Sequence, residues 1–258
     1  MNRYSRYWVA FKAILVKEIL RFIRIWIQTV LPPAITTILY FIIFGNLIGQ
    51  RIGEMDGVRY IDFIVPGLIL MAVITNSYSN VVSSFFSSKY QRHVEELLIS
   101  PVPNWVILGG FVGGGVARGM VVGLTVTVVS LLFTDLHILS YGWTLTVVVL
   151  TSTLFALAGF INAIYANSFD DISIVPSFIL TPLTYLGGVF YSIHMLPEFW
   201  QNVSLANPIF YMVNAFRYGL LGMSDTHIGA ALGIILLFIV GLTGFSLYLL
   251  KRGIGIKS

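Results

Sequence analysis

Long stretches without a charged side chain dominate this chain. No Asp, Glu, Lys or Arg occurs between Ile25 and Gln50 or between Phe63 and Ser88. Further stretches of this kind lie at 97–134 (interrupted only by Arg118), 136–169, 172–197 and 226–250. About 20 apolar residues of α-helix are enough to cross ~30 Å of hydrocarbon. The pattern therefore predicts six transmembrane helices, at 29–49, 63–83, 107–133, 144–166, 172–192 and 228–250.

The composition predicts an all-α polytopic membrane protein. Hydrophobic residues make up 57% of the chain and charged residues only 10%, whereas soluble domains carry roughly 25% charged residues. The apolar stretches are continuous and do not alternate with polar positions, which favours helices over a β-barrel. We expect one transmembrane domain over 1–258, with an interfacial helix at 1–28, a six-span region at 29–250 and a cytosolic tail at 251–258.

The distribution of Lys and Arg predicts the orientation. Six spans place both termini on one side, and that side carries eleven basic residues: Arg3, Arg6, Lys12, Lys17, Arg21, Arg24, Lys89, Arg92, Lys251, Arg252 and Lys257. The other side carries three, Arg51, Arg59 and Arg217. Because basic residues favour the cytoplasmic side, we expect both termini in the cytoplasm.

The N-terminal segment is amphipathic when it is drawn as a helix. Its basic residues gather on one side and apolar residues, including Trp8 and Trp26, on the other. We expect a helix on the cytoplasmic membrane surface with its basic face exposed. It serves either to anchor the chain to anionic lipid or to dock a cytosolic partner. Pro32 and Pro33 are expected at the start of the first span, where the chain turns into the membrane.

The loop between spans two and three predicts a short amphipathic helix over 89–99, which Pro101 and Pro103 end. One side carries Lys89, Arg92, His93 and Glu96, and the other carries Tyr90, Val94, Leu97 and Leu98. An isolated helix of this length is marginal in water. Either a partner protein or the membrane surface must therefore hold it.

The segment at 192–227 is apolar and aromatic although it connects two spans. Pro197 and the Asn207-Pro208 step divide it into two short helical pieces. We expect these pieces to dip back into the outer leaflet, since irregular backbone at membrane depth needs surrounding protein or a cavity. The alternative is a belt of aromatic residues at the membrane interface.

Motifs for catalysis are missing. The chain has no GxxxxGK[ST] loop and no Gly-Lys dipeptide, so we expect it not to hydrolyse ATP itself. It has no cysteine, and its four histidines lack metal-ligand spacing. We therefore expect neither catalytic residues nor metal ligands. Every carboxylate lies at or outside a predicted span end, which weighs against an ion-coupled carrier.

Two spans carry patterns of their own. The glycines of span three, from Gly109 to Gly123, recur at Gly-x-x-x-Gly spacing and predict close helix packing. Arg118 lies among them and is expected to reach the cytoplasmic surface or a backbone carbonyl. Span two carries a polar stripe formed by Asn76, Asn80, Ser83 and Ser87. The stripe either lines a water-filled entrance or lies partly outside the bilayer.

In combination these segments resemble the ABC-2-type (type V) transporter permeases, and the resemblance covers essentially the whole chain. It is carried by Lys17-Glu18 and Arg21, Glu95-Glu96-Leu97-Leu98-Ile99-Ser100-Pro101-Val102, Gly187-Gly188-Val189-Phe190-Tyr191, Leu196-Pro197, Asn207-Pro208-x-x-Tyr211 and Arg217. Many such permeases have Gly-Thr-Leu-Glu before the leucine pair, whereas this chain has His93-Val94-Glu95-Glu96.

The resemblance implies the membrane subunit of an ATP-driven exporter in the bacterial inner membrane. Two identical permease chains would pair, and two copies of a separate ATPase would bind ATP and Mg²⁺. This chain would then need no cofactor of its own and would contact membrane lipid but no nucleic acid. The alternative is an integral-membrane enzyme or accessory protein acting on lipid-linked substrates, which predicts clustered polar residues at one membrane face.

The resemblance also implies roles for particular residues. The implied ATPase contacts are Lys89, Arg92, Glu95, Glu96, Leu97, Leu98, Ser100 and Pro101 in the loop, and Lys17, Glu18, Arg21 and Arg24 in the N-terminal helix. Spans two and five would line the pathway, with Asn76, Asn80, Ser83, Phe190 and Tyr191. Pro197, Trp200, Asn207, Pro208 and Tyr211 would form an external cap.

Overall fold

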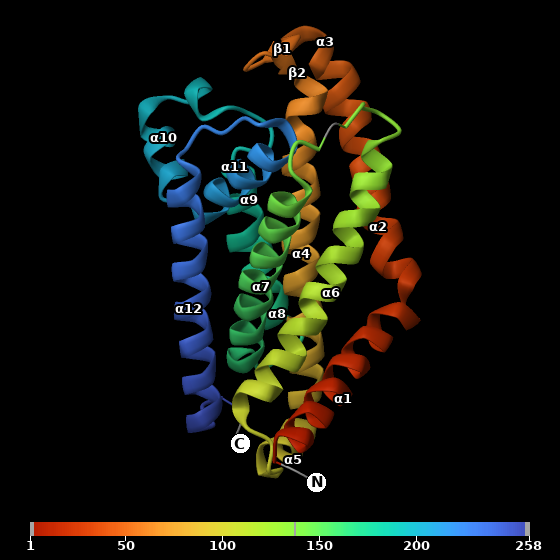
Figure 1. Ribbon diagram of the computed structural model, residues 1–258, viewed down its shortest axis with the longest axis vertical. Coiled ribbons are helices and arrows are strands. Elements are labelled where there is room, and N and C mark those ends of the chain that lie inside the picture. Colours follow the sequence, from red (N-terminus) through yellow and green to blue (C-terminus); the bar gives the residue numbers. More distant parts are fainter. Residues whose placement is uncertain (1–2, 137, 256–258) are drawn as a thin grey trace.

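Long helices run side by side between the two ends of an elongated molecule (Figure 1). The structure is a computed structural model that describes residues 3–136 and 138–255. His137 and Lys257 lie outside the described residues. The described chain is almost entirely helical, with one two-stranded hairpin, and this confirms the all-α fold class.

The elements are, in chain order, α1 (Arg3–Arg24), α2 (Trp26–Tyr40), the π-helical segment η1 (Phe41–Ile48), α3 (Gly49–Ile52), β1 (Glu54–Met55), β2 (Val58–Arg59), α4 (Tyr60–Tyr90), α5 (His93–Ile99), α6 (Asn104–Ser130), α7 (Tyr141–Tyr165), α8 (Asp171–Val175), the π-helical segment η2 (Pro176–Leu180), α9 (Thr181–Tyr185), the 3₁₀ turn η3 (Ile193–Met195), α10 (Glu198–Leu205), α11 (Pro208–Leu221) and α12 (Ile228–Arg252).

Among the described residues, five helices are long and apolar enough to cross a membrane. They are the continuous helix formed by α2, η1 and α3, then α4, α6, α7 and α12. These five confirm the predicted spans one, two, three, four and six. The predicted span at 172–192 is wrong in its outer part, because the helix formed by α8, η2 and α9 ends at Tyr185. The chain then turns at Gly188, whose φ of +72° favours glycine.

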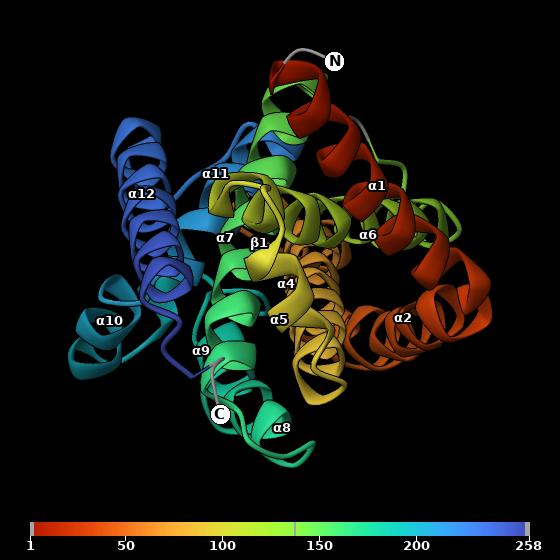
Figure 2. The same cartoon turned by 90° about the horizontal axis from the view of Figure 1, so that it is seen from below.

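The helices α4 and α7 form the centre of the bundle. Both are largely buried, whereas α2 and α12 are mostly exposed at its periphery. Figure 2 shows α2 and α12 on opposite sides of the bundle. At the centre the ring of Phe85 on α4 packs against Phe111 of α6 and Phe160 of α7, with centroids 5.2 and 4.2 Å away. Such aromatic packing fixes the three helices relative to one another.

The glycines of α6 allow other helices to approach closely, as predicted. A Cβ atom added to Gly114 would lie 2.4 Å from Cβ of Glu18 on α1, and one added to Gly110 would lie 2.5 Å from a methyl group of Ile14. On another side of α6, a Cβ on Gly119 would meet the hydroxyl of Ser77 on α4. The glycines therefore admit α1 on one side of α6 and α4 on another.

The helix α1 departs from the prediction in two ways. It packs along α6 and buries Ile14, Glu18 and Phe22, so that its basic side is not wholly exposed. The chain turns into the first span at Ile25 and not at the two prolines, which lie inside α2. The hydroxyl of Thr29 closes this bend by donating to the carbonyls of Phe22 and Ile25, each at 3.3 Å.

The two ends of the molecule differ in their elements. The first and last described residues and α5 lie at one end, and the hairpin formed by β1 and β2 lies at the other (Figure 1). Near the hairpin end, α10 and α11 meet at the Asn207-Pro208 step, as predicted. Most of α11 is buried, where it packs against α4, α7 and α12.

Candidate pathway and coupling surfaces

A buried polar network joins α1 to α4. The Glu18 side chain is fully buried and accepts a hydrogen bond of 2.6 Å from Oγ of Ser84. Arg21 Nε lies 3.4 Å from Oε2 of the same carboxylate. The Arg21 guanidinium donates to the carbonyl and to Oδ1 of Asn80, at 2.7 and 2.8 Å. Charge-assisted hydrogen bonds of this kind are the strong ones, and they fasten α1 to the central helix.

This network gives four of the predicted residues a structural contact. Asn80 is buried and Ser83 Oγ lies 3.3 Å from Nη1 of Arg21, so both residues hold α1. Glu18 is fully buried against α4, whereas the side chain of Arg21 is 30% exposed. The amphipathic pattern alone could not show this, because the partners on α4 lie about 60 residues further along the chain. Lys17 and Arg24 do remain exposed.

Arg118 of α6 lies half-buried close to this network. Its Nε has no hydrogen-bond partner among the described residues. The expected pairing with a backbone carbonyl is therefore not seen for this atom.

The predicted helix over 89–99 is interrupted by a turn. Gln91 and Arg92 form this turn, and Arg92 has a φ of +62°. Lys89 consequently belongs to α4, and its ammonium donates to the carbonyls of Ile164 and Ala166 at 2.5 and 2.7 Å. These carbonyls lie at the end of α7, where the last carbonyls lack helical partners. Lys89 thus links α4 to α7 and is not a free contact residue.

The helix α5 is held by the protein itself. Val94 is 1% exposed, and Leu97 and Leu98 pack against the core, so the predicted apolar strip is mostly covered. Ser100 is half-buried and donates to the carbonyl of Leu97 at 2.6 Å. Glu95 is also half-buried. The residues left exposed between Tyr90 and Pro101 are Tyr90, Gln91, Arg92, His93, Glu96, Ile99 and Pro101.

Ile99 was not among the predicted contacts, yet it is 85% exposed. The available surface around α5 therefore includes Arg92, His93, Glu96, Ile99 and Pro101.

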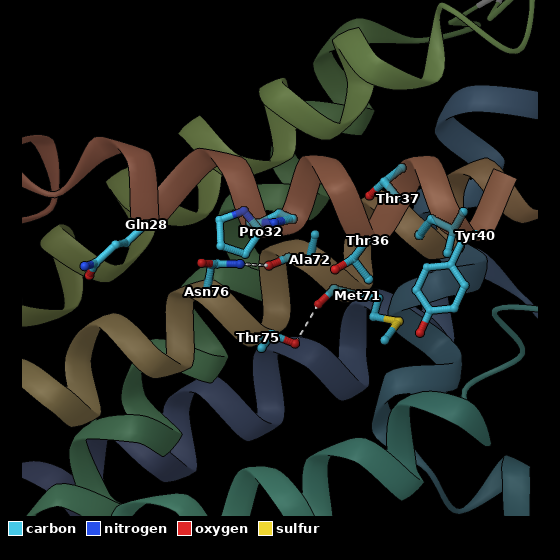
Figure 3. Close-up of a pocket in the computed structure, with 11 residues that line it drawn as sticks. Gln28, Pro32, Thr36, Thr37, Tyr40, Met71, Ala72, Thr75 and Asn76 are labelled. Carbon is cyan, nitrogen blue, oxygen red and sulfur yellow. Dashed lines mark hydrogen bonds between the residues drawn. The ribbon is translucent and has the colours of Figure 1, made fainter. Parts of the chain in front are cut away.

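A groove of about 310 Å³ lies between α2 and α4. Its lining residues are Gln28, Pro32, Pro33, Thr36, Thr37, Tyr40, Leu68, Met71, Ala72, Thr75 and Asn76. Figure 3 shows the side chains of Thr36, Tyr40 and Asn76 between the two helices. Asn76 thus lines the groove, whereas Asn80, one turn further along α4, is not among its described lining residues.

Hydrogen bonding within the groove leaves acceptors free. Nδ2 of Asn76 donates to the carbonyl of Ala72 and Oγ1 of Thr75 to that of Met71, both at 3.0 Å (Figure 3). The lone pairs of the Thr75 hydroxyl and Oδ1 of Asn76 therefore remain available. Pro32 has no N–H, so the carbonyl of Gln28 also lacks its usual helical donor.

An aromatic cluster lies at the end of the groove nearer the hairpin. The hydroxyls of Tyr40 and Tyr185 lie 3.1 Å apart, and the ring of Phe190 stacks on Phe44 with centroids 4.7 Å apart. Phe190 contacts the lining residue Tyr40, with ring centroids 5.4 Å apart, but neither Phe190 nor Tyr191 is among the described lining residues of the groove. The helices that meet here contain η1 and η2, and π-helical segments frequently occur at functional sites.

The residues predicted to form an external cap lie in and around the two short helices α10 and α11. Pro197 precedes α10, on which Trp200 is exposed, and Pro208 begins α11. Asn207 accepts from the amide of Ile209 and donates to the carbonyl of Leu183 at 2.6 Å. Tyr211 donates to the carbonyl of Leu205 at 2.8 Å. These bonds connect α10, α11 and α9.

Arg217 of α11, to which no role was assigned, is the largest fully buried side chain. Its guanidinium donates to the carbonyl of Gly188 at 2.6 Å and lies 3.9 Å from the centre of the Phe63 ring. Nη1 is 3.7 Å from Oδ2 of Asp225. Arg217 therefore ties together the hairpin end of α4, the turn after α9 and the segment before α12.

Comparison with known proteins places these features in a family context. Residues 9–221 match the family model described as ABC-2 type transporter. The chain is 57% identical over 252 residues, 98% of each protein, to the inner membrane transport permease YadH of Escherichia coli K12. It is 23% identical over 216 residues, 83% of each protein, to nodulation protein J of Rhizobium leguminosarum bv. viciae. The corresponding protein of Rhizobium meliloti is 24% identical over 230 residues, 89% of this chain and 88% of the relative.

Proposed function

This chain belongs to the ABC-2 type transporter family, and from that premise we propose that two copies of it form the pathway of an exporter driven by two ATPase subunits. The chain is a multi-pass transport permease of the inner membrane and not an enzyme. Family membership implies an ATPase partner. The proposal consists of four parts: the pairing of two permease chains, the two ATPase copies, their binding of ATP and Mg²⁺, and the export direction. The relatives do not favour an enzyme or accessory protein acting on lipid-linked substrates.

One observation carries the proposed mechanism. Asn80, which binds Arg21 of α1, and Asn76, which lines the groove, are one helical turn apart on α4. A displacement of α1 is therefore transmitted to the groove through a single rigid turn. We assign the groove between α2 and α4 as part of the pathway, with the aromatic cluster at its outer end and the cap of α10 and α11 beyond.

The proposed ATPase surface consists of the exposed side chains at the α5 end. These are Arg92, Glu96, Ile99 and Pro101 around α5, and Lys17 and Arg24 on α1. The half-buried Glu95, Leu97, Leu98 and Ser100 position α5 against the bundle. A helix attached in this way moves with α4, which supports its use as a coupling element.

The proposed orientation places this end in the cytoplasm. The described basic residues of α1, of the end of α12, and Lys89 and Arg92 just before α5 support it, because Lys and Arg favour that side.

The test is co-purification of the permease with its ATPase, followed by transport in proteoliposomes. Ile99→Asp would desolvate a carboxylate in an apolar contact, so we expect weaker ATPase binding. Glu96→Lys is expected to reduce transport per ATP hydrolysed more than it reduces binding. Glu198→Lys, an exposed charge reversal on α10 at the other end, is the matched control. If Ile99→Asp and Glu96→Lys bind and transport like the wild type, α5 is not the docking element.

A further inference from the structure

The groove between α2 and α4 is polar but uncharged. None of its described lining residues is Asp, Glu, Lys, Arg or His. Its polar side chains are amides and hydroxyls, those of Gln28, Thr36, Thr37, Tyr40, Thr75 and Asn76. Neutral groups of this kind donate and accept hydrogen bonds without providing a counter-charge. A desolvated phosphate, carboxylate or ammonium would therefore remain unpaired here, which is strongly unfavourable.

The groove offers both acceptors and donors. Thr75 and Asn76 each already donate one proton to a carbonyl of their own helix. Their oxygen atoms remain available, and Pro32 adds the carbonyl of Gln28, which has lost its helical donor. The amide of Gln28 and the hydroxyl of Thr36 can also donate. A ligand that carries hydroxyl or amide groups, which donate and accept, therefore matches these atoms.

An apolar surface lies next to the groove on α2. Leu31, Ile35 and Leu39 recur every four residues along one side of the helix, and each is about half exposed. They alternate with the groove positions Pro32, Thr36 and Tyr40. Since α2 is exposed at the edge of the bundle, a ligand can place a polar group in the groove while its hydrocarbon chain lies along this surface.

The size of the groove limits the polar group. A volume of about 310 Å³ lies at the lower end of the range of small-molecule pockets, about 300–1,000 Å³. This is enough for a compact head group and too little for a whole amphiphile.

We propose that the groove binds the uncharged, hydroxyl- or amide-bearing head group of an amphiphile that enters sideways from the bilayer. The inference rests on the proposed function, since it names the class of ligand for the pathway. Under this proposal, the side chains of α2 and α4 select the head group of the ligand. Amphiphiles whose charged group would have to enter the groove are excluded.

A cysteine-protection experiment tests this proposal. The chain contains no cysteine, so Thr36→Cys provides a single thiol in the groove. Thr146→Cys is the control, because Thr146 is exposed on α7 and bonded only to its own helix. Each variant is reconstituted in dioleoylphosphatidylcholine vesicles and labelled with a membrane-permeant maleimide. Labelling is repeated with dodecylglycerol, dodecyl phosphate or dodecyltrimethylammonium, which share one chain length and differ in head-group charge.

We expect dodecylglycerol to slow labelling of Thr36→Cys about tenfold and the two charged probes to have little effect. Labelling of Thr146→Cys should be the same with all three probes. In a second variant that also carries Asn76→Asp, dodecyltrimethylammonium should become the better protector, because a carboxylate now supplies its counter-charge.

Three results would overturn the proposal. The first is equal protection by all three probes, and the second is unchanged selectivity in the Asn76→Asp variant. The third is a disulfide between two Thr36→Cys chains that consumes the thiol, which would mean that a second copy fills the groove. ATPase binding is measured on the same samples. If ATPase binding is intact and any of the three results is found, only the groove inference is contradicted. If the native chain does not bind the ATPase, the proposed function is contradicted.

Discussion

Arg21 connects the surface helix α1 to the groove-lining helix α4 through two hydrogen bonds to Asn80. Arg21→Ala removes both bonds and leaves the buried Glu18 without its nearest guanidinium, a loss of about 1–3 kcal/mol per unsatisfied group. We expect ATP hydrolysis to continue while transport per ATP falls, because α1 no longer moves α4. Asn80→Leu should have the same effect. Arg24→Ala, an exposed neighbour, is the control, and equal transport by the Arg21 and Arg24 variants would contradict the coupling role.

Arg217 holds three segments together at the outer end of the bundle. Arg217→Gln removes the cation over Phe63 and leaves Asp225 without its partner, at a cost of about 1–3 kcal/mol. We expect a lower Tm in detergent and an intermediate Tm for Arg217→Lys, which keeps the charge but loses the planar fork. Arg59→Gln, which changes an exposed arginine, should leave the Tm nearly unchanged. A Tm as high in Arg217→Gln as in the wild type would show that this cluster does not stabilise the fold.

At the scale of elements, the contact between α1 and α6 depends on glycine. Gly114→Ala places a methyl group where the structure has only 2.4 Å to Glu18 Cβ, and overpacking of this kind typically costs about 1–3 kcal/mol. We expect a lower Tm and faster tryptic cleavage at Lys12 and Lys17 as α1 separates from α6. Gly233→Ala on α12 is the matched control, because its new Cβ would meet no atom within 4 Å. The prediction is contradicted if both variants are cleaved at the wild-type rate.

Five of the six predicted spans could be found from the sequence because each is a long uninterrupted apolar stretch. The fifth was predicted too long, since an apolar stretch continues through Gly187 and Gly188 although the backbone turns there. The polar pattern on α4 was enough to single out Asn76, which lines the groove. It could not show that Asn80 binds α1, because periodicity on one helix does not identify the partner that packs against it. The buried contacts of Glu18, Lys89 and Arg217 were missed for the same reason.

At the scale of the whole molecule, the proposed orientation can be tested directly because the chain lacks cysteine. Gln91→Cys, in the turn before α5, should react with an impermeant maleimide only from the cytoplasm. Asp56→Cys, in the hairpin at the opposite end, should react only from outside. Both positions are exposed, so access to reagent depends on the side of the membrane alone. Labelling of Asp56→Cys from the cytoplasm would reverse the proposed orientation.

The short helix formed by α8, η2 and α9 has a consequence for the surrounding lipid. Residues 171–185 span about 22 Å at 1.5 Å per residue, whereas the hydrocarbon core is ~30 Å thick. Lipid beside this helix must compress to meet it, at a cost that grows with each ångström of hydrophobic mismatch. The transport rate should therefore depend on the thickness of the bilayer. Its turnover should be higher in vesicles of 14-carbon lipids than in those of 22-carbon lipids, and a rate independent of acyl-chain length would show that the bundle shields this helix from the bilayer.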